Sequence, residues 1–241
     1  LGNWSLGDYF KKESIEFSYT FLTEILGMDR DQLAVTAFAG EGDIPRDEET
    51  ASIWKSHGFR DDQIYFYGKE DNWWGPAGQT GPCGPDTEMF YWVGEGLPPE
   101  GSNKGTDSSN WMEIWNNVFM EYNHLPTGEF VKLEQQNVDT GMGVERITAT
   151  ISGLDDNYKT EIWQPIIAEI EKLSNKKYED NKKAMRIIAD HMRAIVMIAS
   201  DDAGIKPSNT DQGYILRRLI RRIIRLAKSI DIDTSSNFEV G

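Results

Sequence analysis

The sequence contains few of the residues that define several common classes of protein. Its 241 residues include one cysteine, Cys83, and three histidines whose spacing suggests no site. A single cysteine excludes an internal disulfide framework and favours a reducing compartment. Without a second cysteine or a nearby histidine pair, Cys83 cannot build a zinc site, so we expect no zinc in this piece. No run of about eighteen apolar residues occurs, so we expect a cytoplasmic protein with no membrane partner.

Several catalytic signatures are also missing. The sequence contains no GxxxxGK[ST], GxSxG or HExxH pattern. Phosphate-loop, nucleophile-elbow and zinc-protease chemistries therefore have no support. The chain begins at Leu1, and no charged and then apolar leader precedes the first element. This beginning indicates a processed product or a piece of a longer protein.

Basic residues are scarce relative to acidic ones. The chain carries 25 Lys and Arg against 40 Asp and Glu, a formal net charge of −15. Such a surface repels phosphates, so the chain as a whole is not a general nucleic-acid binder. One segment differs, because it holds only basic charges: Arg217, Arg218, Arg221, Arg222, Arg225 and Lys228. The pattern predicts an acidic body with one basic element, which leaves room for a local nucleic-acid contact.

The hydrophobic pattern predicts strands mainly before residue 155 and helices after it. Strand patterns occupy residues 32–38, 63–67, 87–93, 114–122 and 130–133, and the first twelve residues also suit a strand. Helical spacing occupies residues 15–26, 47–57, 161–173, 181–200 and 212–230, with Ser208 or Asn209 capping the last helix. Residues 75–85 hold four glycines and three prolines, which predicts an irregular loop. We expect an α+β fold with domains at 1–155 and 156–241.

The segment from Asp139 to Arg146 reads DTGMGVER. Glycines before a helix start expose backbone amides, and an arginine beside them supplies a planar cation. A phosphate or a nucleotide ring would be held by this combination. A structural glycine turn followed by a helix-capping acid explains the same residues equally well.

Two further segments could line a site. Trp73 and Trp74 precede the glycine- and proline-rich run and could wall a small apolar pocket, although such runs are more often structural connections. In residues 111–120, alternation places Glu113 with Trp115 and Asn117 on one face, and Asn116 on the other. Polar groups in so apolar a strand need a ligand or a hydrogen-bonding partner, unless the strand lies at the edge of the sheet with one face exposed to solvent.

In this order, six segments together resemble the alanyl-tRNA synthetase family of class II aminoacyl-tRNA synthetases. They are LGNWSLGDYFKKESI, DNWWGPAGQTGPCGPDTEMFYW, EIWNNVFMEYN, VDTGMGVERI, ADHMRA and PSNTDQGYILRRLIRR. The resemblance runs from residue 1 to about residue 228. It implies part of the class II antiparallel sheet, followed by a helical domain that recognises the tRNA acceptor stem.

The resemblance also implies an activity and its residues. The family activates L-alanine with ATP and Mg²⁺ and joins the alanine to tRNA(Ala). By resemblance, Asp139 accepts the alanine ammonium, while Trp74, Asn116 and Gly141 line the alanine pocket. Arg146 and Gly143 match the nucleotide-binding motif, and Glu113 matches a catalytic position that could hold Mg²⁺. The tRNA contacts implied in the same way are Asn209, Arg217, Arg218, Arg221, Arg222 and Arg225.

The sequence departs from the family in several places. Motif 1 is absent, as are the first strand of motif 2 with its α-phosphate arginine, the aromatic residue that covers adenine and the zinc-bearing editing domain. Asp86 stands where many members have a second cysteine, and Gln212 where arginine is common. We therefore expect this piece alone to catalyse slowly or not at all.

Two other functions remain compatible with the residues. A stand-alone paralogue could keep the fold and bind tRNA or nucleotide without catalysis, and the missing arginine favours it. Without the resemblance, eight tryptophans and many carboxylates would also suit a sugar-processing enzyme. The basic segment argues against that last hypothesis.

Overall fold

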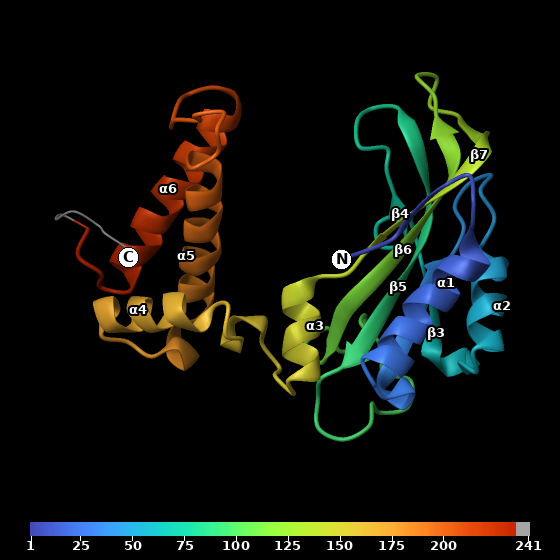
Figure 1. Ribbon diagram of the computed structural model, residues 1–241, viewed down its shortest axis with the longest axis horizontal. Coiled ribbons are helices and arrows are strands. Elements are labelled where there is room, and N and C mark those ends of the chain that lie inside the picture. Colours follow the sequence, from blue (N-terminus) through green and yellow to red (C-terminus); the bar gives the residue numbers. More distant parts are fainter. Residues whose placement is uncertain (235–241) are drawn as a thin grey trace. The chain divides into compact units, whose positions relative to one another are not determined.

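The structure, a computed structural model, describes residues 1–234 and contains two compact units (Figure 1). The first unit comprises residues 1–156, and the second begins at residue 157. The first holds a β-sheet with helices, whereas the described part of the second is helical. Each unit is described below by itself.

The first unit is built on a seven-stranded sheet. In spatial order its strands are β1 (Trp4–Leu6), β7 (Phe130–Gly141), β6 (Trp111–His124), β5 (Gly81–Trp92), β2 (Leu33–Phe38) and β3 (Ile64–Tyr67). The short strand β4 (Trp73–Trp74) pairs with β5 outside this path. Neighbours run antiparallel except β2 and β3, which are parallel. The α+β prediction is confirmed, with a mixed sheet.

Helices α1 (Lys11–Thr20) and α2 (Glu48–Ser56) pack against one face of the sheet. Ile15 of α1 and Trp54 of α2 are fully buried in one core with Met89, Trp115 and Phe119 of the strands. Burying each such side chain stabilises the fold by about 1.5–3 kcal/mol. The opposite face, called here the site face, carries Asp86, Glu88, Asn116, Asp139 and Gly141.

Most predicted elements of the first unit are confirmed. Strands 32–38 and 63–67 correspond to β2 and β3, and the helix at 47–57 corresponds to α2. The first twelve residues differ from the prediction, because only Trp4–Leu6 form a strand and α1 begins at Lys11. α1 continues into a π-helical turn at Phe21–Ile25. α3 (Val144–Ile151) begins within DTGMGVER, as expected.

The prediction of an irregular loop over residues 75–85 is wrong for its second half. Gly81 to Pro85 form the start of β5, in which Gly81, Pro82 and Cys83 pair with β6, while Gly84 and Pro85 pair with β4. A side chain at Gly84 would place its Cβ 1.9 Å from the carbonyl oxygen of Phe119. Only glycine permits that approach, and a register shift between Cys83 and Asp86 accommodates the neighbouring prolines.

The predicted alternation along β6 is also wrong at one position. Met89 lies opposite Trp115 and Phe90 lies opposite Glu113, so Ile114 is an extra residue in a bulge. Both Ile114 and Trp115 enter the core under α1. The bulge shifts the alternation by one residue, which places Glu113 on the same face as Asn116 and not with Asn117.

In the second unit, three helices enclose a separate apolar core. They are α4 (Gln164–Ser174), α5 (Tyr178–Ala199) and α6 (Asp211–Ser229). Ile167, Ile188 and Ile223, one from each helix, are buried together. The three predicted helices are confirmed within a few residues. No helix among residues 1–234 is long and apolar enough to cross a membrane.

Two details of α6 differ from expectation. Thr210 occupies the N-cap position in place of Ser208 or Asn209. Gly213 allows the segment before the helix to pack closely against the first turn of α6, since a Cβ at this position would clash with Ser208 Oγ. The buried face of α6 is narrower than the spacing of its apolar residues suggests, because Ile215 and Ile224 are 47% and 40% exposed.

A buried lysine joins three elements of the first unit. Lys11, whose side chain is 6% exposed, lies 2.9 Å from Asp47 and 3.2 Å from Glu121 of β6. Asp47 also caps α2 by accepting a hydrogen bond from the backbone of Thr50. Burial lowers the pKa of Lys11, but the surrounding carboxylates outweigh it and hold the pKa above its usual value.

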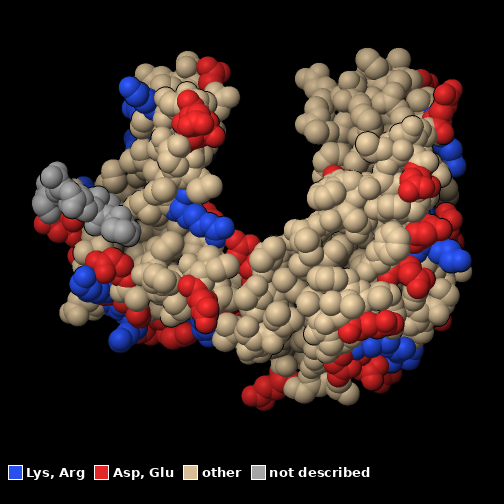
Figure 2. Space-filling model, in the orientation of Figure 1, with Lys and Arg blue, Asp and Glu red and all other residues tan. Residues whose placement is uncertain are grey.

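On the face drawn in Figure 2, acidic and basic side chains gather mainly toward the helices of this unit.

Replacing Lys11 tests this network. Lys11→Met should destabilise the fold by about 3–5 kcal/mol, because it leaves Asp47 and Glu121 buried without their cation. Urea denaturation measures the loss. Lys12→Met is the matched control, since Lys12 is exposed and should change stability by no more than about 0.5 kcal/mol. Equal effects of the two substitutions would contradict the structural role of the network.

Candidate active site

Three of the four predicted alanine-pocket residues, Asn116, Asp139 and Gly141, are brought to one face of the sheet by strand pairing, whereas Trp74 lies on β4 and pairs with Gly84. Asn116 of β6 lies opposite Gly141 of β7, and Val118 lies opposite Asp139. Residues paired in this way share a face of the sheet, which is the site face. A Cβ at Gly141 would lie 3.2 Å from Asn116 Oδ1. The missing side chain therefore leaves the Asn116 amide open to a ligand.

Asp139 has an unused carboxylate. It is half-buried between Trp4 of β1 and Val118 of β6. Among residues 1–234 its side chain makes no hydrogen bond or ion pair. A half-buried carboxylate with all its lone pairs available suits a cationic ligand, because charge-assisted hydrogen bonds are stronger than neutral ones.

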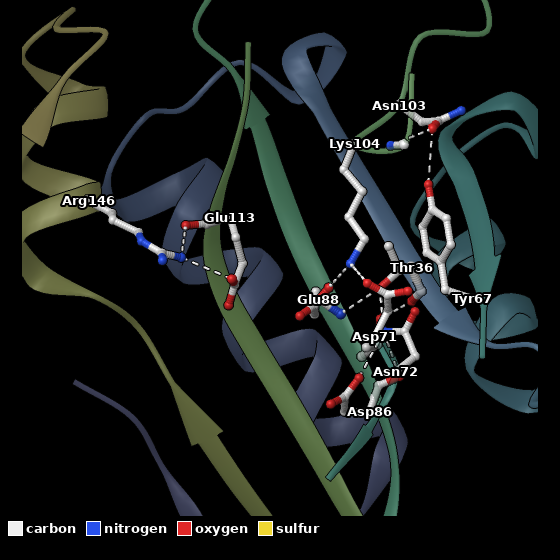
Figure 3. Close-up of polar contacts among 12 residues, drawn as sticks. Thr36, Tyr67, Asp71, Asn72, Asp86, Glu88, Asn103, Lys104, Glu113 and Arg146 are labelled. Atoms are coloured by element: carbon white, nitrogen blue, oxygen red, sulfur yellow. Dashed lines mark hydrogen bonds and ion pairs between the residues drawn. The ribbon is translucent and has the colours of Figure 1, made fainter. Parts of the chain in front are cut away.

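Arg146 and Glu113 form a pair at the edge of the site face (Figure 3). Arg146 lies in the first turn of α3, and its Nη1 donates to Glu113 Oε2 at 2.9 Å and to the Glu113 carbonyl at 3.2 Å. Gly143 is the N-cap of the same helix, close to the Arg146 side chain. The guanidinium is half-exposed, so its remaining donors can meet an anion or its plane an aromatic ring.

A cavity of about 540 Å³ lies beside this pair. Its lining includes Tyr67, Asp71, Phe90, Lys104, Trp111, Glu113 and Arg146. Lys104, from the loop at 93–110, lies 2.8 Å from Glu88 and 3.2 Å from Asp71 (Figure 3). Its Nζ also lies 4.8 Å and 5.1 Å from the ring centres of Tyr67 and Phe90. Sequence reasoning missed Lys104, because nothing in its loop marks a functional residue.

A buried polar pair holds β4 in place. Asn72 is fully buried, and its Nδ2 donates to Thr36 Oγ1 at 2.7 Å and to Asp86 Oδ1 at 2.8 Å (Figure 3). Burial raises the pKa of Asp86 to about 7, against the lowering effect of the bond from Asn72. Burial also raises the pKa of Glu88, while Lys104 opposes that rise. Polar residues flanking the glycine-rich run were the one sequence signal for this pair.

The two tryptophans of β4 have different environments. Trp73 packs among the rings of Phe38, Tyr122 and Phe130. Trp74 pairs with Gly84 and is 40% exposed. Of the two, Trp74 is the ring available to a ligand, whereas Trp73 belongs to a packed cluster.

The predicted tRNA-contact residues lie in the second unit. The five arginines of α6 are all exposed: Arg217, Arg218, Arg221, Arg222 and Arg225. Arg217 donates a hydrogen bond to Asn209 Oδ1, and Arg218 lies over the ring of Tyr214. The structure thus brings Asn209 to the start of the basic helix face. No group of three or more His, Cys, Asp or Glu within residues 1–234 is arranged to hold a metal ion.

Comparison with known proteins defines the class of this chain. The family model described as tRNA synthetases class II (A) matches residues 1–239, so the chain belongs to the class II tRNA synthetase family. This membership accounts for the α+β fold and excludes the sugar-processing hypothesis.

Curated relatives narrow the comparison. The chain is 53% identical over 240 residues to the alanine--tRNA ligase of Treponema denticola, with 97% of this chain and 40% of the relative covered. It is 47% identical to that of Borreliella afzelii, with 96% and 40% covered. For Myxococcus xanthus the identity is 41%, with 93% and 26% covered. The chain therefore spans less than half the length of these relatives.

The pKa of Asp86 leads to a test of stability against pH. Between the ordinary pKa of 3.8 and about 7, the folded protein holds a proton that the unfolded chain has lost. Stability should therefore fall as the pH rises through this range. Asp86→Asn should remove that loss and raise the melting temperature more at about pH 8 than at about pH 5, by roughly 2–4 °C per kcal/mol.

Differential scanning calorimetry at the two pH values measures this difference. Glu134→Gln, a substitution at an exposed carboxylate of β7, is the control and should give the same small change at both. A gain for Asp86→Asn that does not depend on pH would contradict a buried carboxyl that titrates near neutrality.

Proposed function

We propose that this chain is part of an alanine–tRNA ligase, which activates L-alanine with ATP and joins it to tRNA(Ala) in the cytoplasm. The observation that carries the proposal is the meeting of Asp139, Asn116 and Gly141 on one face of a class II sheet. Relatives named alanine--tRNA ligase that align with nearly the whole chain support the same function. Catalysis by this piece alone would be slow or absent, as expected from the segments it lacks.

The alanine pocket would work by charge and by shape. The Asp139 carboxylate accepts hydrogen bonds from the alanine ammonium, and the Asn116 amide orients the substrate beside it. Gly141 leaves space over that amide, while the exposed ring of Trp74 would wall the pocket. Together these residues favour a small amino acid held by its ammonium group.

Activation would need positioning and not a side-chain nucleophile. The alanine carboxylate attacks the α-phosphorus of ATP, a bond from oxygen to phosphorus forms, and pyrophosphate leaves with the electrons of the bond that breaks. Holding the reacting atoms together and neutralising the leaving group are the main contributions of a protein to such a step. Arg146, oriented by Glu113, would bind the nucleotide, with Gly143 setting the start of its helix.

The site fits a magnesium ion only as part of a nucleotide complex. Mg²⁺ is usually held by one or two carboxylates together with phosphates and water, so one carboxylate, Glu113, is sufficient. Bound there, the ion would neutralise phosphate charge. In the absence of the nucleotide, Glu113 is held by Arg146.

The second unit would supply the tRNA contact. The exposed arginines of α6 form a basic face that can meet backbone phosphates of the acceptor stem. Asn209, at the start of this face, would read a base. The competing function is a non-catalytic paralogue that binds tRNA or nucleotide, and it predicts no binding of the alanine moiety.

Ligand binding tests the alanine pocket. A non-hydrolysable alanyl-adenylate analogue at about 100 times its dissociation constant should stabilise the protein by roughly 2.7 kcal/mol, which is visible in a thermal shift assay. Asp139→Asn should abolish most of the shift, because the ammonium loses its charged acceptor. Glu134→Gln should retain it. No shift in folded wild-type protein would refute the alanine pocket and favour the paralogue.

RNA binding tests the basic helix. Replacing Arg218, Arg221 and Arg222 with alanine should weaken binding of an acceptor-stem minihelix for all sequences, and should reduce its salt dependence by about one phosphate per arginine. Fluorescence anisotropy at several salt concentrations measures both effects. The matched control is Lys172, Lys176 and Lys182 to alanine, because each of these lysines is already paired with an acid. If both triple variants bound like wild type at low salt, α6 would serve packing only.

A further inference from the structure

A second carboxylate lies in line with Asp139 on the site face. In the pairing of β5, β6 and β7, Asp86 is opposite Val118, and Val118 is opposite Asp139. Residues paired in this way point to one face, and neighbouring strands are about 4.8 Å apart, so the two carboxylates stand about 10 Å apart across Val118. Asp86 therefore lies next to the part of the site face that an amino acid bound at Asp139 would cover.

Asp86 also links the site face to β4, the strand that carries Trp73 and Trp74. Its Oδ1 accepts the hydrogen bond from Asn72, and its backbone N–H donates to the Asn72 carbonyl at 3.2 Å. Asn72 immediately precedes Trp73 and Trp74, which pair with Pro85 and Gly84 just before Asp86. The other carboxylate oxygen, Oδ2, has no hydrogen-bond partner within residues 1–234. One oxygen thus anchors β4, and the second remains available to a ligand or to water.

We propose that Asp86 is a positioning residue of the amino-acid pocket, which holds the strand of Trp74 through Asn72 and adds a second negative charge that favours the ammonium bound at Asp139. The inference rests on the proposed function, since it concerns the same pocket. Asp86 acts through Asn72 and through its field, and it leaves direct contact with the substrate to Asp139.

The charges around Asp86 leave its own charge uncompensated by a direct ion pair. The charged and titratable groups on the surrounding segments are Asp71, Glu88, Lys104, Glu113 and Asp139. The one cation among them, Lys104, is paired with Glu88 and Asp71. A ligand ammonium would therefore be the first cation to face Asp86 across Val118.

This arrangement makes the pocket sensitive to pH near neutrality. Because burial raises the pKa of Asp86 to about 7, the carboxyl is largely neutral in mildly acidic solution and ionised in mildly basic solution. Two unit charges about 10 Å apart, at an effective dielectric constant of about 20, change a binding constant by about tenfold. An ammonium ligand should bind more tightly as Asp86 ionises, and its binding should release a proton at neutral pH.

The test uses the full-length protein that carries this chain and two ligands that differ by one charge. The first is a non-hydrolysable alanyl-adenylate analogue, and the second is its propionyl counterpart, which lacks the ammonium. Between about pH 5.5 and about pH 7.5, a range in which the α-ammonium of the first ligand stays mostly protonated, wild-type affinity for that ligand should rise severalfold as Asp86 ionises. Affinity for the second should stay constant.

Asp86→Asn isolates the charge, because the asparagine oxygen can still accept the hydrogen bond from Asn72. This variant should bind the alanyl analogue with the low-pH affinity of wild type at every pH, and calorimetry in buffers of different ionisation enthalpy should show no proton release near neutral pH. Glu134→Gln is the matched control and should behave like wild type. The wild-type pH profile is a second measurement that needs no variant.

The outcomes separate the two proposals. If Asp86→Asn bound the alanyl analogue with the same pH dependence as wild type, or if wild-type affinity did not change with pH, the charge of Asp86 would have no part in binding and the inference would be overturned. If wild-type protein bound neither ligand, or if Asp139→Asn bound the alanyl analogue normally, the alanine pocket itself would be refuted, and this inference would fall with it.

Discussion

The pairing register of β5, β6 and β7 is the constraint on which the first unit depends. It places Asp86, Val118 and Asp139 in one row and Glu88, Asn116 and Gly141 in the next. A slip of one residue would turn the five side chains of these two rows, all except Gly141, into the core under α1 and α2. The register is secured by glycines that tolerate close backbone approach, above all Gly84 against Phe119, and by the bulge at Ile114. Lys11 adds to this by tying α1, α2 and β6 into one buried network.

The same register decides where charge is satisfied and where it is left for a ligand. Arg146 pairs with Glu113, and Lys104 pairs with Glu88 and Asp71. Asp139 and one oxygen of Asp86 have no partner within residues 1–234, so the negative charge that remains is concentrated across Val118. An ammonium group suits such a place, because two carboxylates favour it and the paired cations do not oppose it directly. In the function proposed above, the anionic part of the substrate would lie toward Arg146, which lines the 540 Å³ cavity.

The second unit combines a small apolar core with a basic helix face that is exposed to solvent. Its helices bury Ile167, Ile188 and Ile223 in a small core, while the arginines of α6 stay in solvent. Long arginine side chains on an exposed helix face lose little by remaining hydrated, and they keep their donors available to phosphates. The strong acidity of the chain as a whole therefore does not prevent a local contact with RNA, because charges beyond about 10 Å are largely screened at physiological salt.

The sequence by itself determined the kinds of element and the family. Period-two and helical patterns located β2, β3, α2 and the three long helices, and six ordered segments pointed to the class II synthetases before any fold was known. These features are local, so they can be read from neighbouring residues. Only the tertiary structure decided the strand at Gly81–Pro85, the bulge that turns Glu113 toward Asn116, and the contacts of Lys104 and Asn72. Asn72 meets Thr36 across 36 positions of sequence, and Lys104 meets Glu88 from an irregular loop. Register, burial and the pKa of Asp86 all depend on such distant partners, and no local pattern encodes which partners will meet.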